Sequence, residues 1–368
     1  MNYYEVESQE ALNNILKVSK EVKSYAFQNL DFTNLEMLTE KHVFEKCMFL
    51  GCAIPDTLNS KLKDCLIFPL IDVPYNTFIN KLYTKDRLYS GYQPGNPESY
   101  KNTYDKIVYD HFIKTGKEPT NIEETLARSL HDHSITDAMY DFLEGYEEKK
   151  VVAIVGGHGL LRSDPFFFET TKISKSLTEQ GYLMVSGGGP GAMEATHVGA
   201  WMAGRDEEEL SEVIKILAEA PSYKDKLWLD KTFEVLEKYP YSDYKSLGIP
   251  TWLYGHEPPT PFATHIAKYF ANSIREDGIL TIAKGGVIYT PGSAGTVQEI
   301  FQDATQNHYL SFEYASPMVF FNTEFWTHEM PLYPVFKRLK DIGKYQHIIS
   351  SCCDTSEEVI EEVRKFTN

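Results

Sequence analysis

From residue 151 onward, short apolar runs alternate with longer segments in which apolar positions recur at helical spacing. The apolar runs predict strands at 151–155, 183–185, 250–254, 286–289, 317–321 and 347–350. The segments between them predict helices at 167–179, 191–203, 264–283, 294–307 and 331–341, with a last helix after the capping-box pattern at Thr355. This alternation is typical of a doubly wound parallel sheet, so we predict a Rossmann-like α/β fold.

The first 148 residues lack this alternation and predict an N-terminal α+β extension. Residues 8–22 predict an amphipathic helix with Ser8 as its N-cap, and residues 122–130 and 135–146 predict two further helices. We expect this extension to form interfaces or to regulate the rest of the chain. The second domain is expected to span residues 149–368, with a charged helical insert at 206–246.

Two short segments of the extension, 44–49 and 62–68, are loosely alike. Successive turns of a small β-structure would explain the likeness, and so would chance. Because at least three copies are wanted before a solenoid is assigned, chance is the preferred interpretation.

The composition restricts the kinds of binding partner and the cellular compartment that we expect for this protein. The net charge is −17, which argues against a broad nucleic-acid groove, since phosphate backbones need clustered Lys and Arg. The five cysteines include no Cys-x-x-Cys pair, which favours a reducing cytoplasm over a disulfide scaffold. The start of the chain has no signal-peptide pattern, and no apolar run approaches the roughly 20 residues that span a membrane. We therefore expect a cytoplasmic protein without nucleic-acid or membrane partners.

Two glycine-rich loops each follow a predicted strand and precede a predicted helix. The first reads Ser-Gly-Gly-Gly-Pro-Gly-Ala-Met-Glu at 186–194, and the second reads Pro-Gly-Ser-Ala-Gly-Thr-Val-Gln-Glu at 291–299. Such a turn leaves backbone N–H groups unpaired at the positive end of a helix, where a phosphate binds readily. Two such loops at one edge of a parallel sheet predict a site for a phosphorylated ligand.

These paired loops resemble those of the LOG family, which comprises cytokinin-activating phosphoribohydrolases and related bacterial nucleotide 5′-monophosphate nucleosidases. The family hallmark is Pro-Gly-Gly-x-Gly-Thr-x-x-Glu, and Ser293 stands here in place of its second glycine. The resemblance covers roughly residues 151–366, and the N-terminal extension is similar to the extra parts of the longer bacterial members. It implies hydrolysis of the N-glycosidic bond of a nucleoside 5′-monophosphate, without a cofactor, by a homodimer or larger homo-oligomer.

The resemblance also implies roles for particular residues. A carboxylate near the sugar stabilises the positive charge of an oxocarbenium-like state, which makes Glu299 the catalytic candidate, with Arg275 as its companion. The other predicted substrate-binding residues are Gly187, Gly188, Gly189, Gly191, Gly292, Ser293, Gly295, Thr296, His158 and Glu257.

Each assignment has a structural alternative. Glu299 could cap its helix together with Thr296, and Arg275 could form only a surface ion pair with Glu276 or Asp277. The glycines could serve strand–helix packing alone, His158 could be structural, and Glu194 could merely compensate a helix dipole.

No metal is predicted. His131 and His133 point to opposite sides of a helix and lack a third ligand. The rival function is that of a carrier or sensor of the same fold that holds a nucleotide or a pterin cofactor without cleaving it.

Overall fold

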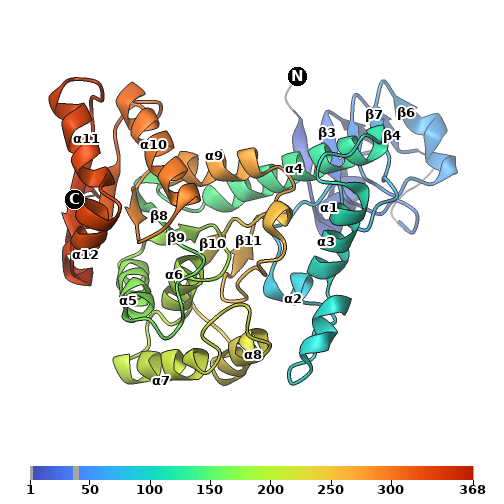
Figure 1. Cartoon of the computed structure of the whole chain (residues 1–368). Coiled ribbons are helices and arrows are strands. Elements are labelled where there is room, and N and C mark those ends of the chain that lie inside the picture. The colour runs from blue at the N-terminus through green and yellow to red at the C-terminus, as the bar shows by residue number, and fades with distance from the viewer. Residues whose placement is uncertain (1–2, 36–40, 368) are drawn as a thin grey trace. The chain divides into compact units, whose positions relative to one another are not determined.

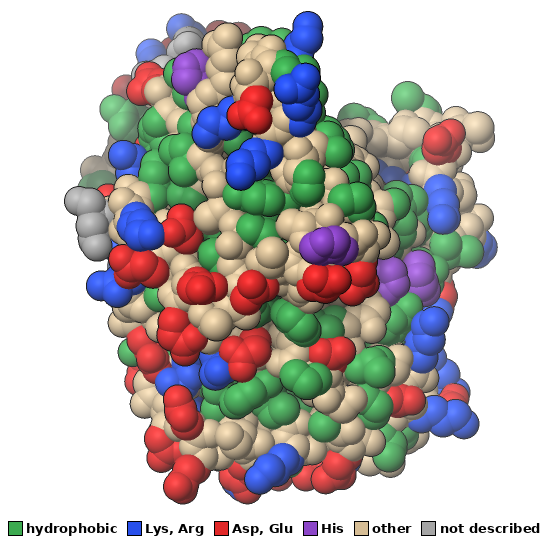
Figure 2. Space-filling model, turned by 60° about the vertical axis from the view of Figure 1, so that its left-hand side comes forward, with side chains coloured by type: hydrophobic (Ala, Val, Ile, Leu, Met, Phe, Trp, Pro, Cys, Tyr) green, Lys and Arg blue, Asp and Glu red, His purple; other side chains and the backbone are tan. Residues whose placement is uncertain are grey.

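The computed structural model describes residues 3–35 and 41–367 (Figure 1). The chain divides into two compact units, one made of Met1–Leu82 with His111–Phe142 and the other of Tyr83–Asp110 with Leu143–Asn368. Acidic side chains form a band across the face shown in Figure 2, in keeping with the net charge of −17. None of the described helices is long and apolar enough to cross a membrane.

The second unit is built on a seven-stranded sheet with the order β11-β10-β9-β8-β12-β13-β14. Every neighbouring pair is parallel, as predicted for this α/β fold class. The strands are β8 (Val151–Val155), β9 (Leu183–Ser186), β10 (Ser246–Gly248), β11 (His265–Ile266), β12 (Gly286–Tyr289), β13 (Pro317–Phe321) and β14 (Ile349–Cys353).

Helices cover both faces of this sheet. The helices of this unit are α5 (Pro165–Glu179), α6 (Ala192–Trp201), α7 (Glu207–Ala218), α8 (Trp228–Lys238), α9 (Asn272–Ile282), α10 (Ala294–Tyr309), α11 (Leu332–Asp341) and α12 (Ser356–Thr367), of which α7 and α8 pack against α5 and α6 and not against the sheet. On one face, Phe321 packs in a buried cluster with Ile173 of α5 and Val359 of α12. On the other, the Phe320 ring lies 6.1 Å from that of Phe336 in α11. Since successive residues of a strand point to opposite faces, the sheet is doubly wound.

Two predicted elements of this unit are wrong. A strand was expected at 250–254, but the strand in this part of the chain is β10 at Ser246–Gly248, and Trp252–Tyr254 form a 3₁₀ turn. The long helix expected at 264–283 contains helix only at α9, because residues 264–271 run along the sheet edge and include β11. Backbone bonds from Trp252 N to Tyr269 O and from Tyr269 N to Pro250 O hold that segment extended, so tertiary pairing overrides its helical pattern.

The segment Tyr83–Asp110 also belongs to this unit. It contains α2 (Lys85–Leu88) and the first turns of α3 (Tyr104–Thr115). The predicted helical insert is present as α7 and α8, and α7 begins with a complete capping box between Asp206 and Glu209.

In the first unit, the two loosely similar segments are successive turns of a parallel stack, so the preference for chance similarity was wrong. Its strands are β1 (Tyr4–Val6), β2 (Glu21–Lys23), β3 (Tyr25–Gln28), β4 (Val43–Glu45), β5 (Met48–Leu50), β6 (Leu62–Lys63) and β7 (Leu66–Phe68). They form one parallel sheet in the order β1-β3-β5-β7 and another in the order β2-β4-β6. The rings of Phe27, Phe32, Phe44 and Phe49 fill the space inside, with centroids 5.2–5.9 Å apart.

The helices of the first unit agree in part with the predictions. Helix α1 (Gln9–Val18) begins at Ser8, whose side chain accepts a hydrogen bond from Ala11 N, as predicted. The two helices expected at 122–130 and 135–146 are one continuous helix, α4 (Ile122–Leu143). The polar residues at the expected break are satisfied inside the protein, since His131 pairs with Asp132 and Ser134 donates to Thr77 O.

Candidate functional site

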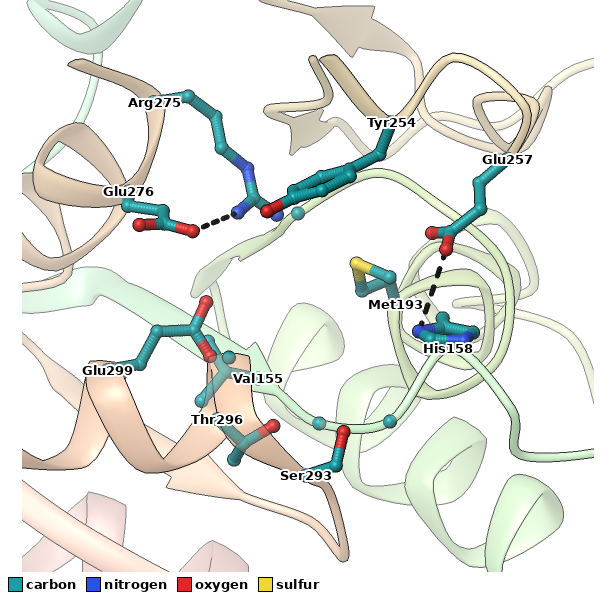
Figure 3. A pocket seen from close by; sticks show the side chains of 14 residues that line it. Val155, His158, Met193, Tyr254, Glu257, Arg275, Glu276, Ser293, Thr296 and Glu299 are labelled. Carbon is teal, nitrogen blue, oxygen red and sulfur yellow. Dashed lines mark ion pairs between the residues drawn. The ribbon is translucent and has the colours of Figure 1, made fainter. Parts of the chain in front are cut away.

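The candidate site is a cavity of about 220 Å³ at the carboxyl ends of β8, β9 and β12 (Figure 3). The chain passes from β8 outward to β11 and then returns to place β12 on the other side of β8. Neighbouring loops therefore leave the sheet in opposite directions at β8 and β12. In open parallel sheets, ligands bind at such a switch point.

One end of the cavity is the start of α10. Ser293, Gly295 and Thr296 line it, and Ser293 is the N-cap residue without a side-chain cap bond. The N–H groups of the first helical turn are thus available to an anion. Gly292 does not line the cavity, but a Cβ there would come 2.1 Å from Thr296 Oγ1. Gly292 is therefore required by the close packing of the loop, and Ser293 keeps the N–H that its position needs.

Glu299 lies in the second turn of α10 and its side chain lines the same cavity. Because α10 begins at Ala294, Glu299 is too far along the helix to cap it, and the capping alternative is wrong. Only 8% of Glu299 is exposed, and no described group hydrogen-bonds its carboxyl group. Burial raises its pKa from 4.5 to about 7, against the lowering effect of Arg275. The group is thus poised to exchange a proton near neutrality.

Arg275 extends from α9 into the cavity beside Glu299 (Figure 3). Its Nε donates to Ile249 O at 3.0 Å, and its guanidinium lies 3.7 Å from the Glu276 carboxylate. A Cβ on Gly187 would come 2.3 Å from this guanidinium, so the glycine makes room for the arginine. Arg275 therefore pairs with Glu276, as its structural alternative predicted, and it also faces the cavity, where its catalytic role stays a prediction.

The other glycines of the first loop shape the cavity without lining it. Gly188 has φ +68°, and a Cβ there would come 2.9 Å from Pro250; a Cβ on Gly191 would come 2.4 Å from Gly157 O. A Cβ on Gly189 would meet the terminal methyl of Met193 at 3.0 Å. Their packing alternative is thus the one that the geometry favours, whereas Gly187 and Met193 line the cavity.

A buried polar chain supports this loop. Gly188 N donates to Ser186 Oγ at 3.0 Å, and His197 bridges Ser186 and Ser246 at 2.8 and 2.9 Å. Burial lowers the pKa of His197 to about 3, so the ring stays neutral while it links β9, α6 and β10.

The wall opposite Glu299 carries His158 and Glu257, and the Tyr254 ring extends from the same side toward Arg275 (Figure 3). His158 Nδ1 lies 3.6 Å from Glu257 Oε1, which joins the loop after β8 to the loop after β10. Both residues were predicted as ligand contacts and both line the cavity. Tyr254 and Glu276 also line it, although the motifs gave no sign of them. Tyr254 could have been predicted from its position, because it lies in a loop that follows a strand at the carboxyl edge of the sheet, where ligands bind.

A buried network in the second unit holds that wall in place. Asp105, at the start of α3, accepts hydrogen bonds from Lys268 Nζ at 2.5 Å and from Trp252 Nε1 at 3.1 Å, and all three side chains are buried. The Tyr109 ring packs against Gly255, and Tyr89 donates its hydroxyl to Pro259 O. The segment that precedes the sheet in sequence therefore supports the loop that carries Tyr254 and Glu257.

Glu194 has a partner that the sequence analysis missed. Its carboxylate receives two hydrogen bonds from the buried guanidinium of Arg162, at 2.6 and 2.9 Å. Arg162 also donates to Trp228 O at 3.0 Å and to Thr232 Oγ1 at 2.5 Å. Because Trp228 and Thr232 lie on α8, this ion pair attaches the helical insert to α6. Glu194 also lies in the first turn of α6, so compensation of the helix dipole is not its only role.

Among the described residues, one group of three carboxylates is close enough to share a metal ion, namely Glu7, Asp137 and Asp141. None of the three lines the cavity. His131, considered as a ligand from sequence, is buried and pairs with Asp132.

Comparison with known proteins finds likeness in three dimensions only. No protein-family model and no curated protein matches the chain. The molybdenum cofactor binding protein from the phototrophic bacterium Rippkaea orientalis matches with 13% identity and a TM-score of 0.37, over 59% of this chain and 97% of that chain. A Northeast Structural Genomics Consortium target matches with 19% identity and a TM-score of 0.38, over 59% and 99%. The molybdenum cofactor carrier protein from Chlamydomonas reinhardtii matches with 13% identity and a TM-score of 0.36, over 59% and 97%.

Proposed function

We propose that this protein hydrolyses the N-glycosidic bond of a nucleoside 5′-monophosphate and releases the free base and ribose 5-phosphate. The observation that carries the proposal is the position of Glu299, a buried carboxyl group without a hydrogen-bond partner among the described residues, in the same cavity as the uncapped start of α10. A phosphate-binding helix end and an acid of raised pKa are the two groups that this reaction needs close together.

The spacing of these groups suits a ribose 5-phosphate. Glu299 lies five positions after Ala294, which is roughly 7.5 Å along a helix axis. A phosphate on the first-turn N–H groups would therefore place the sugar alongside the Glu299 carboxyl group. In this pose the 5′-phosphate anchors the ligand, and the binding energy of the phosphate orients the anomeric carbon.

The chemistry follows from charge. As the bond to the base breaks, positive charge builds on the ribose, and the ionised Glu299 stabilises it at close range. Ionised Glu299 also accepts one proton of the water molecule that attacks the anomeric carbon. The departing base nitrogen takes up one proton, so Glu299 returns to its ionised form and the free base leaves neutral. Arg275 favours the ionised form of Glu299, and its guanidinium can donate to the departing base or to a phosphate oxygen. We therefore expect the reaction rate to rise with pH through about 7.

The direct test is to incubate the purified chain with each common nucleoside 5′-monophosphate and to measure free base and ribose 5-phosphate by chromatography. The proposal predicts equal amounts of the two products, and a loss of at least about a hundredfold in kcat for Glu299→Gln. Tight binding of a monophosphate without release of base at any pH between 5 and 9 would support the carrier function instead.

A further inference from the structure

The Glu257 carboxylate faces the cavity with its capacity to accept hydrogen bonds almost unused. Its side chain is only 15% exposed, yet its nearest charged partners are His158 at 3.6 Å and His256 at 3.7 Å. Both distances are beyond hydrogen-bond length, and no described group donates to this carboxylate. An ionised carboxylate has about four acceptor positions, so Glu257 is prepared for a ligand that donates.

Glu276 of α9 also lines the cavity, but its carboxylate already has hydrogen-bond donors within the protein. It accepts hydrogen bonds from Asn272 Nδ2 at 2.7 Å and from Gln298 Nε2 at 2.6 Å, and it also pairs with Arg275. Its acceptor positions are therefore largely taken by the protein. Glu257 differs from Glu276 in that its carboxylate still needs hydrogen-bond donors, which a ligand in the cavity would supply.

The surroundings of Glu257 favour a flat ring. In Figure 3, Glu257 and His158 lie on the opposite side of the cavity from Glu299, with the ring of Tyr254 and the thioether of Met193 between them. The Tyr254 side chain is partly exposed, which leaves ring surface free for stacking. An aromatic face stacks on a nucleobase, and a thioether adapts to an aromatic edge.

We propose that Glu257 recognises the edge of a 2-amino-4-oxo-pyrimidine ring by accepting two parallel hydrogen bonds, one from its ring N–H and one from its amino group. This inference rests on the proposed function and specifies its substrate class. Among the common bases, guanine alone presents these two donors side by side. Adenine and cytosine place a ring-nitrogen acceptor beside the amino group, and uracil places its N–H between two carbonyls, so each of them turns an acceptor toward the carboxylate.

The same donor edge occurs in pterins. The ligand of this chemistry is therefore a guanine nucleotide or a phosphorylated pterin, and the two are distinguished by measurement. A guanosine monophosphate can be cleaved at an N-glycosidic bond, whereas a pterin phosphate has no such bond and could only be held.

The test measures Kd by calorimetry for guanosine, inosine and adenosine 5′-monophosphates and for neopterin monophosphate. It uses the Glu299→Gln chain, which should leave the nucleotides intact. Inosine monophosphate lacks only the 2-amino group, so the ratio of its Kd to that of guanosine monophosphate isolates one of the two hydrogen bonds. We expect this ratio of Kd values to be about ten or more, because the loss of one hydrogen bond to a charged group weakens binding by at least that factor. Adenosine monophosphate should bind more weakly than either.

Adding Glu257→Gln should bring the ratio close to one, because an amide presents only one acceptor oxygen and turns its own donors toward the ligand. Glu234→Gln, an exposed change on α8, is the matched control and should leave the ratio unchanged. A ratio near one before Glu257 is changed would overturn the inference, and so would a ratio that survives Glu257→Gln. Failure of both the guanine nucleotide and the pterin to bind would also overturn it.

These outcomes are separable from those of the proposed function. If the unaltered chain releases no base but the ratio depends on Glu257, the nucleosidase proposal fails and the recognition proposal stands. In that case, a lower Kd for neopterin monophosphate than for guanosine monophosphate would identify the pterin as the ligand. If the chain cleaves adenosine and guanosine monophosphates and binds them equally, the function stands and the inference fails.

Discussion

Replacing Glu299 with glutamine should make the protein more stable at alkaline pH while it abolishes turnover. Burial raises the pKa of Glu299 from 4.5 to about 7. Between these two pH values the folded chain holds a proton that the unfolded chain has released, so the free energy of unfolding falls as the pH rises through this window. The pKa shift corresponds to a loss of about 3 kcal/mol in the free energy of unfolding, and this loss is complete above pH 7. Glutamine is uncharged and of similar shape, and therefore avoids this loss.

The assay is urea denaturation of both proteins at pH 5 and pH 8, followed by circular dichroism. We expect the variant to exceed the unaltered protein by up to about 3 kcal/mol at pH 8 and by much less at pH 5. Glu361→Gln on α12 is the matched control, because that acid lies at the surface beside Arg364 and its loss should change stability by less than about 0.5 kcal/mol. A variant that is about 1 kcal/mol less stable than the unaltered protein at pH 8 would refute the reasoning, since that result is expected of a structural helix residue.

Three further predictions concern packing. Gly292→Ala should weaken binding of a monophosphate by about tenfold or more in calorimetry, because its Cβ would meet Thr296 Oγ1 at 2.1 Å. Gly278→Ala has open space around its Cβ in α9 and should instead add up to about 1 kcal/mol of stability in thermal unfolding. Arg162→Met should cost about 3–5 kcal/mol in urea denaturation, and a second change, Glu194→Met, should restore most of it; no recovery would contradict the buried ion pair. Phe49→Ala should destabilise the first unit by about 3–5 kcal/mol, and a loss below about 1 kcal/mol by the same assay would mean that the aromatic cluster is not its core.

The sheet and the glycine loop that leads into α10 could be predicted from sequence because their signals are local. Continuous apolar runs such as 151–155 predict strands buried on both faces, and the loop at 291–296 follows one of them directly. On the opposite side, His158 and Glu257 were predicted but Tyr254 was not, since the loop that carries Tyr254 is held in place by the network around Lys268 and Asp105. That network joins residues more than 160 positions apart, and no local pattern records it.

The same limit explains the misassigned segments. Residues 264–271 have a helical pattern of apolar positions, but pairing of β11 with β10 keeps them extended. The turns of the stack in the first unit differ in length and composition, so only a loose likeness between two segments is visible in the sequence. The pairing of Phe44 with Leu62 and of Phe49 with Ile67 shows that they are successive turns. Glu299 was predicted as the catalytic acid from its motif, and the structure places it in the cavity. Whether it also caps its helix depended on where α10 begins, which a sequence places only to within a few residues.

The central claim is that the start of α10 holds a phosphate and so presents a sugar to Glu299. A crystal structure of the Glu299→Gln chain with an intact nucleoside 5′-monophosphate tests it most directly. We predict phosphate oxygens within hydrogen-bond distance of the backbone N–H groups of residues 294–296, and the anomeric carbon beside the side chain at position 299. A phosphate bound elsewhere, or a side chain at 299 that faces away from the sugar, would contradict the account.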